Sequence, residues 1–159
     1  MASFDRMIGL AFALAMLGGF VDAIGFISLS GFFVSFMSGN STRLGVEIIR
    51  ANPAGIAIAG GVIALFVAGV IAAALLARAA GRRRRIAVLG WATICLATAA
   101  WLDRDGAVVA STSALVLAMS SLNSVFERDG QTTLAVTYMT GTLVKMGQQI
   151  AIALTGGPK

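Results

Sequence analysis

The feature that most constrains this chain is segment 54–77, which contains no charged side chain and ends only at Arg78. About 20 consecutive apolar residues are enough for a helix to cross the hydrocarbon core of a bilayer. The whole chain shares this character, because 58% of its residues are hydrophobic and 12% are charged, against about 25% charged in a typical soluble domain. A small domain leaves much of its surface in water, so the sequence predicts an integral membrane protein.

The apolar segments predict an all-α fold, a polytopic bundle of transmembrane helices. Polar clusters that contain Gly mark turns, and Pro53 suits the first turn of a new helix. The first segment is too long for a typical signal peptide, so we expect it to be retained. The expected membrane segments are residues 7–29, 31–50, 54–80, 86–102, 107–126 and 131–155.

Four of the twelve cations are consecutive and lie between two apolar segments, at Arg82, Arg83, Arg84 and Arg85. A basic block beside a membrane span is typical of a cytoplasmic loop. We therefore attribute the net charge of +5 to basic residues that orient the protein in the membrane, and we expect no nucleic-acid binding.

The residue types that most soluble enzymes use are scarce. Cys95 is the single cysteine and there is no histidine, which excludes an intrachain disulfide, a histidine zinc site and a Ser-His-Asp triad. No nucleophile–base pair or metal-ligand cluster is visible. The sequence predicts a protein that is not an enzyme and that carries no cofactor and no metal, with Cys95 as a buried structural residue.

An internal repeat relates the two ends of the chain. Residues 36–40 (FMSGN) match residues 138–142 (YMTGT), and each motif is followed by a cation, Arg43 or Lys145. On the preceding segments, Asp22 aligns with Asn123 when one gap is allowed. We predict a single membrane domain over 1–159, with a first repeat half at 7–80 and a second, incomplete half at 107–159.

Paired helix interruptions in a duplicated membrane protein indicate a transporter-type site. A Gly between hydroxyl and amide side chains interrupts a helix and supplies N-caps for its resumption. A helix that restarts inside the membrane presents unpaired N–H groups and a partial positive charge, which together with two cations favour an anion. The predicted substrate-binding residues are Asp22, Ser38, Gly39, Asn40, Arg43, Asn123, Thr140, Gly141, Thr142 and Lys145.

A purely structural role for the same residues is an open alternative. Arg43 and Glu47 have the i, i+4 spacing of a helical ion pair, and Asp22 could be a buried partner of Arg43. Hydroxyl side chains in membrane helices often bond back to a carbonyl.

Two membrane topologies are compatible with the segments. If 31–50 is re-entrant, the N-terminus and the arginine block lie in the cytoplasm and the two repeats have opposite orientation. If 31–50 crosses fully, the repeats are parallel and the N-terminus lies outside. Arg6 favours the first arrangement under the positive-inside rule.

Two stretches resemble the signatures of a known family. GFVDAIGF at 19–26 with GFFVSFMSGN at 31–40 is similar to the first signature of the YoaK family, the domain of unknown function 1275. SLNSVF at 121–126 with TYMTGTLVKMG at 137–147 is similar to the second. The family usually has Thr where Ser38 stands, which keeps the hydroxyl group.

The resemblance implies a small, multi-pass protein of the bacterial inner membrane with about six helices, and it supplies no substrate. Family members usually continue with a further span, and no counterpart of 54–80 follows the second motif. A missing span would leave the packing face of a helix uncovered, and this would favour a homo-oligomer or a larger membrane complex. We expect a permease for a small, anionic solute, and the alternative is a non-transporting accessory subunit of such a complex, in each case within the lipid bilayer.

Overall fold

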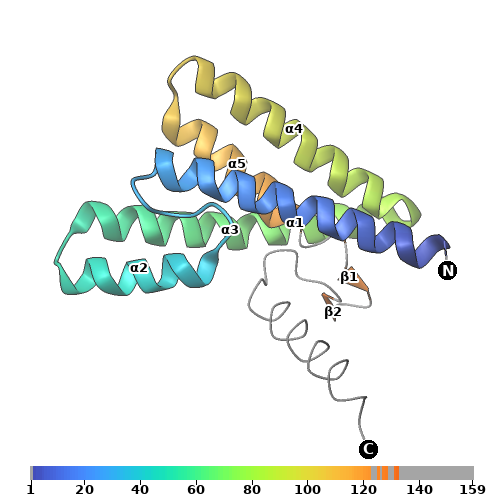
Figure 1. Ribbon diagram of the computed structural model, residues 1–159, viewed down its shortest axis with the longest axis horizontal. Helices are drawn as coiled ribbons and strands as arrows, with labels where there is room; N and C mark the ends of the chain where they lie inside the picture. Colours follow the sequence, from blue (N-terminus) through green and yellow to red (C-terminus); the bar gives the residue numbers. More distant parts are fainter. Residues whose placement is uncertain (1, 123–124, 126, 129–130, 133–159) are drawn as a thin grey trace, which may run out of the picture.

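The computed structural model describes residues 2–122, 125, 127–128 and 131–132, and Figure 1 shows their course. The elements in chain order are α1 (Ala2–Ser28), α2 (Met37–Ile49), α3 (Pro53–Ala80), the 3-10 turn η1 (Gly81–Arg83), α4 (Arg84–Arg104), α5 (Val108–Leu122), β1 (Glu127–Arg128) and β2 (Gln131–Thr132). The two short strands pair antiparallel. Apart from this two-residue ladder the described fold is all-α, as predicted.

Helix α5 is the centre of the bundle. It packs against α4, α3 and α1, while α2 packs against α3 (Figure 1). Met119 and Val116 of α5 are almost fully buried, together with Val88 of α4 and Val21 of α1. The core therefore lies where four helices converge, and α2 is attached to its side.

Small residues allow the helices to approach closely, as is common in membrane bundles. A Cβ atom at Gly69 of α3 would collide with the Ser120 hydroxyl of α5, and one at Gly18 of α1 would lie 3.2 Å from the Met119 methyl carbon. Both glycines are buried. The contacts of α5 with its neighbours thus depend on the absence of a side chain at these positions.

The structure turns at the three places that the sequence predicts, but α4 (Arg84–Arg104) is two residues longer at each end than the predicted segment 86–102. Pro53 occupies the first turn of α3, and α3 ends at Gly81, which has a positive φ of 53°. Helix α4 ends at Arg104, followed by Gly106 with φ 70°. Glycine adopts positive φ at little cost, so the chain turns sharply at both positions.

The interruption predicted at the Gly39-Asn40 step is wrong in its position. Helix α2 runs unbroken from Met37 to Ile49, so Gly39 and Asn40 lie in its first turn. The irregular backbone lies earlier, at 29–36, which the prediction had assigned to the apolar start of a helix. In Figure 1 this connecting segment, residues 29–36, turns back from the end of α1, after which α2 runs in roughly the same direction as α1.

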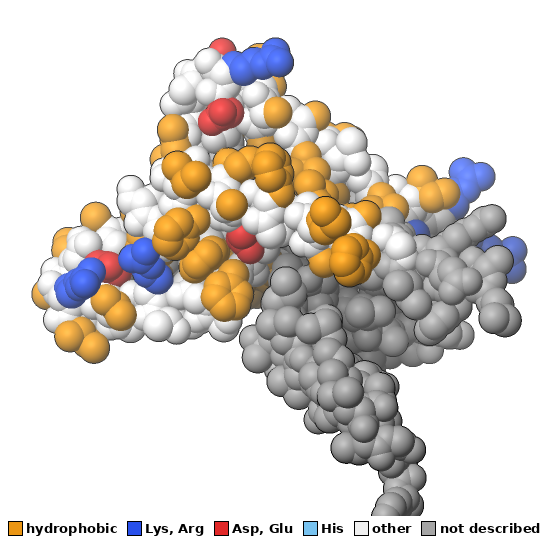
Figure 2. Space-filling model, in the orientation of Figure 1, with side chains coloured by type: hydrophobic (Ala, Val, Ile, Leu, Met, Phe, Trp, Pro, Cys, Tyr) orange, Lys and Arg blue, Asp and Glu red, His pale blue; other side chains and the backbone are white. Residues whose placement is uncertain are grey.

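The surface of the bundle is strongly apolar. Residues Pro53–Arg104, which comprise α3, η1 and α4, form a candidate membrane span whose best window has a mean hydropathy of 2.6 and is only 17% buried within the protein. Phe12–Ser28 and Val108–Leu122 are shorter apolar helices. On the face shown in Figure 2 hydrophobic side chains are spread over the middle with one acidic side chain among them, and the other charged side chains lie toward the outer parts of the molecule. Such a surface suits contact with lipid rather than water.

The repeat halves at 7–80 and 107–159 stay predictions. The segment predicted as the last span, 131–155, lies outside the described residues except for Gln131 and Thr132, which form β2. The matching motif at 138–142 lies there as well.

Candidate functional site

Asp22, on α1, holds the connecting segment 29–36 in place. Its Oδ1 atom accepts hydrogen bonds from the backbone N–H groups of Val34 at 2.9 Å and Ser35 at 2.7 Å. Its Oδ2 atom accepts a third from the Ser35 hydroxyl at 2.6 Å. Hydrogen bonds to a charged acceptor are stronger than those between neutral groups. Asp22, which was predicted from the sequence as a substrate-binding residue, therefore anchors a non-helical segment. Its described partners are backbone and hydroxyl groups rather than Arg43.

Asn40, on α2, holds the same segment from the other side. Its Oδ1 atom accepts a hydrogen bond from the Phe33 N–H at 2.9 Å, and its Nδ2 group donates one to the Phe33 carbonyl at 2.7 Å. The side chain is fully buried. Asn40 thus replaces the backbone partners that Phe33 would have in a helix or strand, as a buried peptide group requires.

Glycines of the first signature make room for this arrangement. A Cβ atom at Gly25 would lie 2.6 Å from Cγ1 of Val34, so the segment can rest on α1 only where α1 has no side chain. Gly31 has φ 101°, and a Cβ atom there would collide with the guanidinium of Arg43. Gly39 packs in the same manner against the rings of Phe33 and Phe36.

Arg43 is the cation of this site. Its guanidinium lies over two aromatic rings, with Cζ 5.7 Å from the Phe26 centroid and 5.3 Å from the Phe32 centroid. Both distances fall within the range of cation–π attraction. Within the part of the chain that the structure describes, no carboxylate forms an ion pair with Arg43. Its positive charge is half-buried against rings and the backbone of Gly31.

Glu47 does not pair with Arg43, which was one alternative from the sequence. Its Oε1 atom lies 3.7 Å from Nη1 of Arg50, and its Oε2 atom accepts a hydrogen bond from Asn52 at 2.7 Å. The carboxylate packs on Gly55 at the start of α3. Glu47 therefore fixes the turn between α2 and α3 and leaves the charge of Arg43 unneutralised by this residue.

The structure brings together four of the predicted site residues: Asp22, Gly39, Asn40 and Arg43 all contact the connecting segment. Ser38 lies exposed in the first turn of α2, where its carbonyl accepts a hydrogen bond from the Thr42 hydroxyl. The remaining predicted residues lie outside the described part of the chain: Asn123, Thr140, Gly141, Thr142 and Lys145.

The aromatic partners of Arg43 and the role of Ser35 were not predicted from the sequence. A signal was present, since Phe26 and Phe32 each follow one of the glycines that the segment requires. In this region a Gly-Phe pair places a ring beside a point of close backbone approach.

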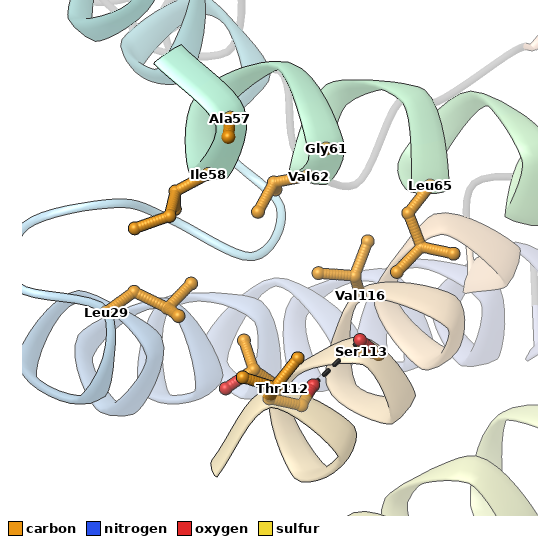
Figure 3. A pocket seen from close by; sticks show the side chains of 10 residues that line it. Leu29, Ala57, Ile58, Gly61, Val62, Leu65, Thr112, Ser113 and Val116 are labelled. Carbon is orange, nitrogen blue, oxygen red and sulfur yellow. Dashed lines mark hydrogen bonds between the residues drawn. The ribbon is translucent and has the colours of Figure 1, made fainter. Parts of the chain in front are cut away.

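A cavity of about 410 Å³ lies between α3, α5 and Leu29, the residue that follows α1, and none of the predicted site residues lines it. Figure 3 shows its walls of aliphatic side chains, including Leu29, Val62 and Val116. The hydroxyls of Thr112 and Ser113 donate to carbonyls of their own helix, at 2.7 Å each. This groove thus offers hydrocarbon contact and suits an apolar occupant rather than a polar solute.

A bundle of long apolar helices, with an apolar surface and a bonded non-helical segment among them, defines an integral membrane protein. The chain belongs to the family described as protein of unknown function DUF1275, whose sequence profile matches residues 10–158. The resemblance noted from the two signatures is thereby confirmed.

A UPF0700 transmembrane protein of Rhizobium meliloti (strain 1021) is 35% identical to this chain over 143 residues. The match covers 89% of this chain and 61% of the relative, so the chain spans about three fifths of the length of the curated relative. No solved structure matches the chain.

Proposed function

We propose that this protein is a multi-pass permease of the bacterial inner membrane for a small anionic solute, without enzymatic activity. The observation that carries the proposal is the position of Arg43, a half-buried cation that faces rings and a non-helical backbone segment. A charge within a membrane bundle is costly and is by default a functional hypothesis.

The connecting segment supports a transport site. Non-helical backbone at membrane depth is tolerated where it is buried in protein or lines a water-filled cavity, and broken helices of this kind form the sites of many transporters. Asp22 and Asn40 already accept hydrogen bonds from the backbone N–H groups of Phe33, Val34 and Ser35. An incoming anion would therefore meet Arg43 first. We assign Lys145, which follows the matching motif, as its counterpart in the second half.

The length of α2 favours the re-entrant topology. Its 13 residues extend about 20 Å at 1.5 Å per residue, which is less than the hydrocarbon core of about 30 Å. In Figure 1 the N-terminus and the junction of α3 with α4 lie toward the same side of the molecule. This arrangement agrees with a cytoplasmic N-terminus and a cytoplasmic arginine turn.

Flux through reconstituted full-length protein tests the proposal. Proteoliposomes would be assayed with labelled chloride, phosphate, sulfate and acetate, and a flux above that of empty liposomes is expected for at least one. Arg43→Ala and Lys145→Ala should lower it about tenfold or more, since each removes a charge from a low-dielectric site. Arg43→Lys should lower it as well, because a lysine does not stack on two rings as a guanidinium does.

Arg50→Ala is the matched control. Arg50 is the residue that caps the end of α2, its side chain is 66% exposed, and it lies 3.7 Å from Glu47. Its loss should leave flux within about twofold, because Glu47 keeps its hydrogen bond from Asn52 and a pair with an exposed arginine contributes little. Unchanged flux in both Arg43→Ala and Lys145→Ala would remove the site assignment, and no flux for any probe would count against transport of these anions.

A second candidate function is that of an accessory subunit in a membrane complex. Ala57, Gly61, Ala64 and Ala68 lie exposed along one face of α3, and no atom lies within 4 Å of a Cβ built at Gly61. Such spacing suits packing against another helix. Purification in mild detergent tests this second function. A stoichiometric partner chain is expected for an accessory subunit, and a chain that migrates alone contradicts that role.

A further inference from the structure

We propose that the turn between α3 and α4 is a binding site for the phosphate headgroup of an anionic membrane lipid. Arg82, Arg83, Arg84, Arg85 and Ile86 line a pocket of about 420 Å³ at this turn. In Figure 2 blue side chains gather at the edge of the molecule beside the junction of α3 and α4. The site is separate from the connecting segment, and the inference does not depend on solute transport.

The backbone concentrates these arginines on a small surface. Gly81, with φ 53°, ends α3, and η1 reverses the chain within three residues before α4 begins at Arg84. The first N–H groups of α4 therefore lie at the same turn, where a helix start carries a partial positive charge. Guanidinium groups bind phosphate oxygens through paired hydrogen bonds. The turn thus combines donors and positive potential in one concave surface.

No acid from the two helices neutralises this turn. The sequence contains no Asp or Glu between Glu47 and Asp103, and Asp103 lies at the far end of α4. The 21 residues of α4 extend about 30 Å, which is several Debye lengths at physiological salt. Neither helix of the turn therefore offsets the positive charge of Arg82, Arg83 and Arg84, and this charge favours binding of an external anion.

The surroundings favour a lipid phosphate over a free one. Ile86 is 72% exposed beside the arginines, and Leu75, in the last part of α3, is 60% exposed. A soluble phosphate gains nothing from apolar neighbours, whereas a lipid places its acyl chains against them while its headgroup binds the cations. The positive-inside rule explains a basic loop, but it does not require that the arginines line a common pocket.

Lipid retention by the full-length protein tests the inference. The protein, purified in mild detergent, would be titrated with phosphatidylglycerol or phosphatidylcholine, and retained lipid measured by native mass spectrometry. We expect preferential retention of phosphatidylglycerol, weakened about tenfold or more in R82Q/R83Q/R84Q, since each juxtamembrane cation near an anionic surface contributes several-fold in affinity. The charge-preserving R82K/R83K/R84K should keep most of the affinity, and R50Q/R104Q, altered at other helix ends, should keep all of it.

Three outcomes would overturn the inference. One is equal retention by the glutamine variant and the unaltered protein, and another is equal retention of phosphatidylcholine and phosphatidylglycerol. The third is binding of inorganic phosphate alone as tight as binding of the lipid, which would assign the pocket to a soluble anion. If the glutamine variant does not fold, the salt dependence of lipid retention by the unaltered protein replaces it. Raising NaCl from about 50 to about 500 mM should weaken phosphatidylglycerol retention several-fold by screening. Unchanged retention would refute the site.

Discussion

Asp22 and Ser35 are joined by two hydrogen bonds, one from the backbone N–H of Ser35 to Oδ1 at 2.7 Å and one from its hydroxyl to Oδ2 at 2.6 Å. Together with the bond from Val34, they attach the connecting segment to the middle of the bundle. An acid in a membrane helix is costly unless it is paired or hydrogen-bonded. Here one carboxylate satisfies three donors, which accounts for its presence without an ion pair.

Removal of this carboxylate should destabilise the protein. Asp22→Ala leaves two backbone N–H groups and a hydroxyl without their acceptor, and we expect a loss of about 2–4 kcal/mol, since each buried unsatisfied group costs about 1–3 kcal/mol. Thermal unfolding in detergent measures it. Asp103→Ala, at the exposed end of α4, should change stability by less than about 0.5 kcal/mol. Equal melting temperatures for the two variants would contradict the anchoring role.

Gly25 and Val34 should be energetically coupled. Gly25→Ala places a Cβ atom 2.6 Å from Cγ1 of Val34, and overpacking of this kind costs about 1–3 kcal/mol. Val34→Ala removes the opposing methyl groups, so the double variant should be more stable than the sum of the single effects predicts. Gly19→Ala, whose Cβ meets nothing within 4 Å, is the control and should be neutral or slightly stabilising. Additive single effects would show that the two residues do not meet.

The sequence predicted the helices well where hydrophobic length alone decides, and less well where side chains replace backbone partners. Pro53, Gly81 and Gly106 mark turns through the backbone preferences of proline and glycine, which can be read directly from a sequence. The connecting segment looks like the start of a helix because Phe32, Val34 and Phe36 are apolar, and nothing local indicates that Asp22 and Asn40 will bind its backbone.

The candidate site was predicted in the same uneven manner. The residue types Asp22, Asn40 and Arg43 were identified because polar groups are rare in apolar segments, but their partners depend on how α1, the segment and α2 fold against one another. The sequence offered Asp22 and Glu47 as acidic partners for Arg43. In the structure its guanidinium lies over the rings of Phe26 and Phe32 instead. Long-range packing decides that choice, and spacing along one helix cannot.

Asn40 should tolerate no substitute that lacks its donor. Asn40→Asp keeps an acceptor for the Phe33 N–H but presents a carboxylate oxygen to the Phe33 carbonyl, where Nδ2 now donates at 2.7 Å. We expect a loss of about 2–4 kcal/mol, because a hydrogen bond is lost and two acceptors are forced together in a buried position. Ser41→Ala is the control, since Ser41 is exposed and bonds back to Met37. Retained stability in Asn40→Asp would refute the paired bonds to Phe33.

The two ends of α4 should be accessible from opposite sides of the membrane. Starting from Cys95→Ala, which removes the single buried thiol, cysteines at Ala54, Ala79 and Asp105 would occupy exposed positions at successive helix ends. Because α3 and α4 each exceed about 30 Å at 1.5 Å per residue, both can cross the hydrocarbon core. An impermeant maleimide should label Ala54→Cys and Asp105→Cys in intact spheroplasts, and Ala79→Cys only in inverted vesicles, since the neighbouring arginine turn is expected in the cytoplasm. Labelling of Ala79→Cys and Asp105→Cys from one side would mean that α4 does not span the bilayer, and the reverse pattern would place the arginine turn, and its proposed lipid site, on the outer leaflet.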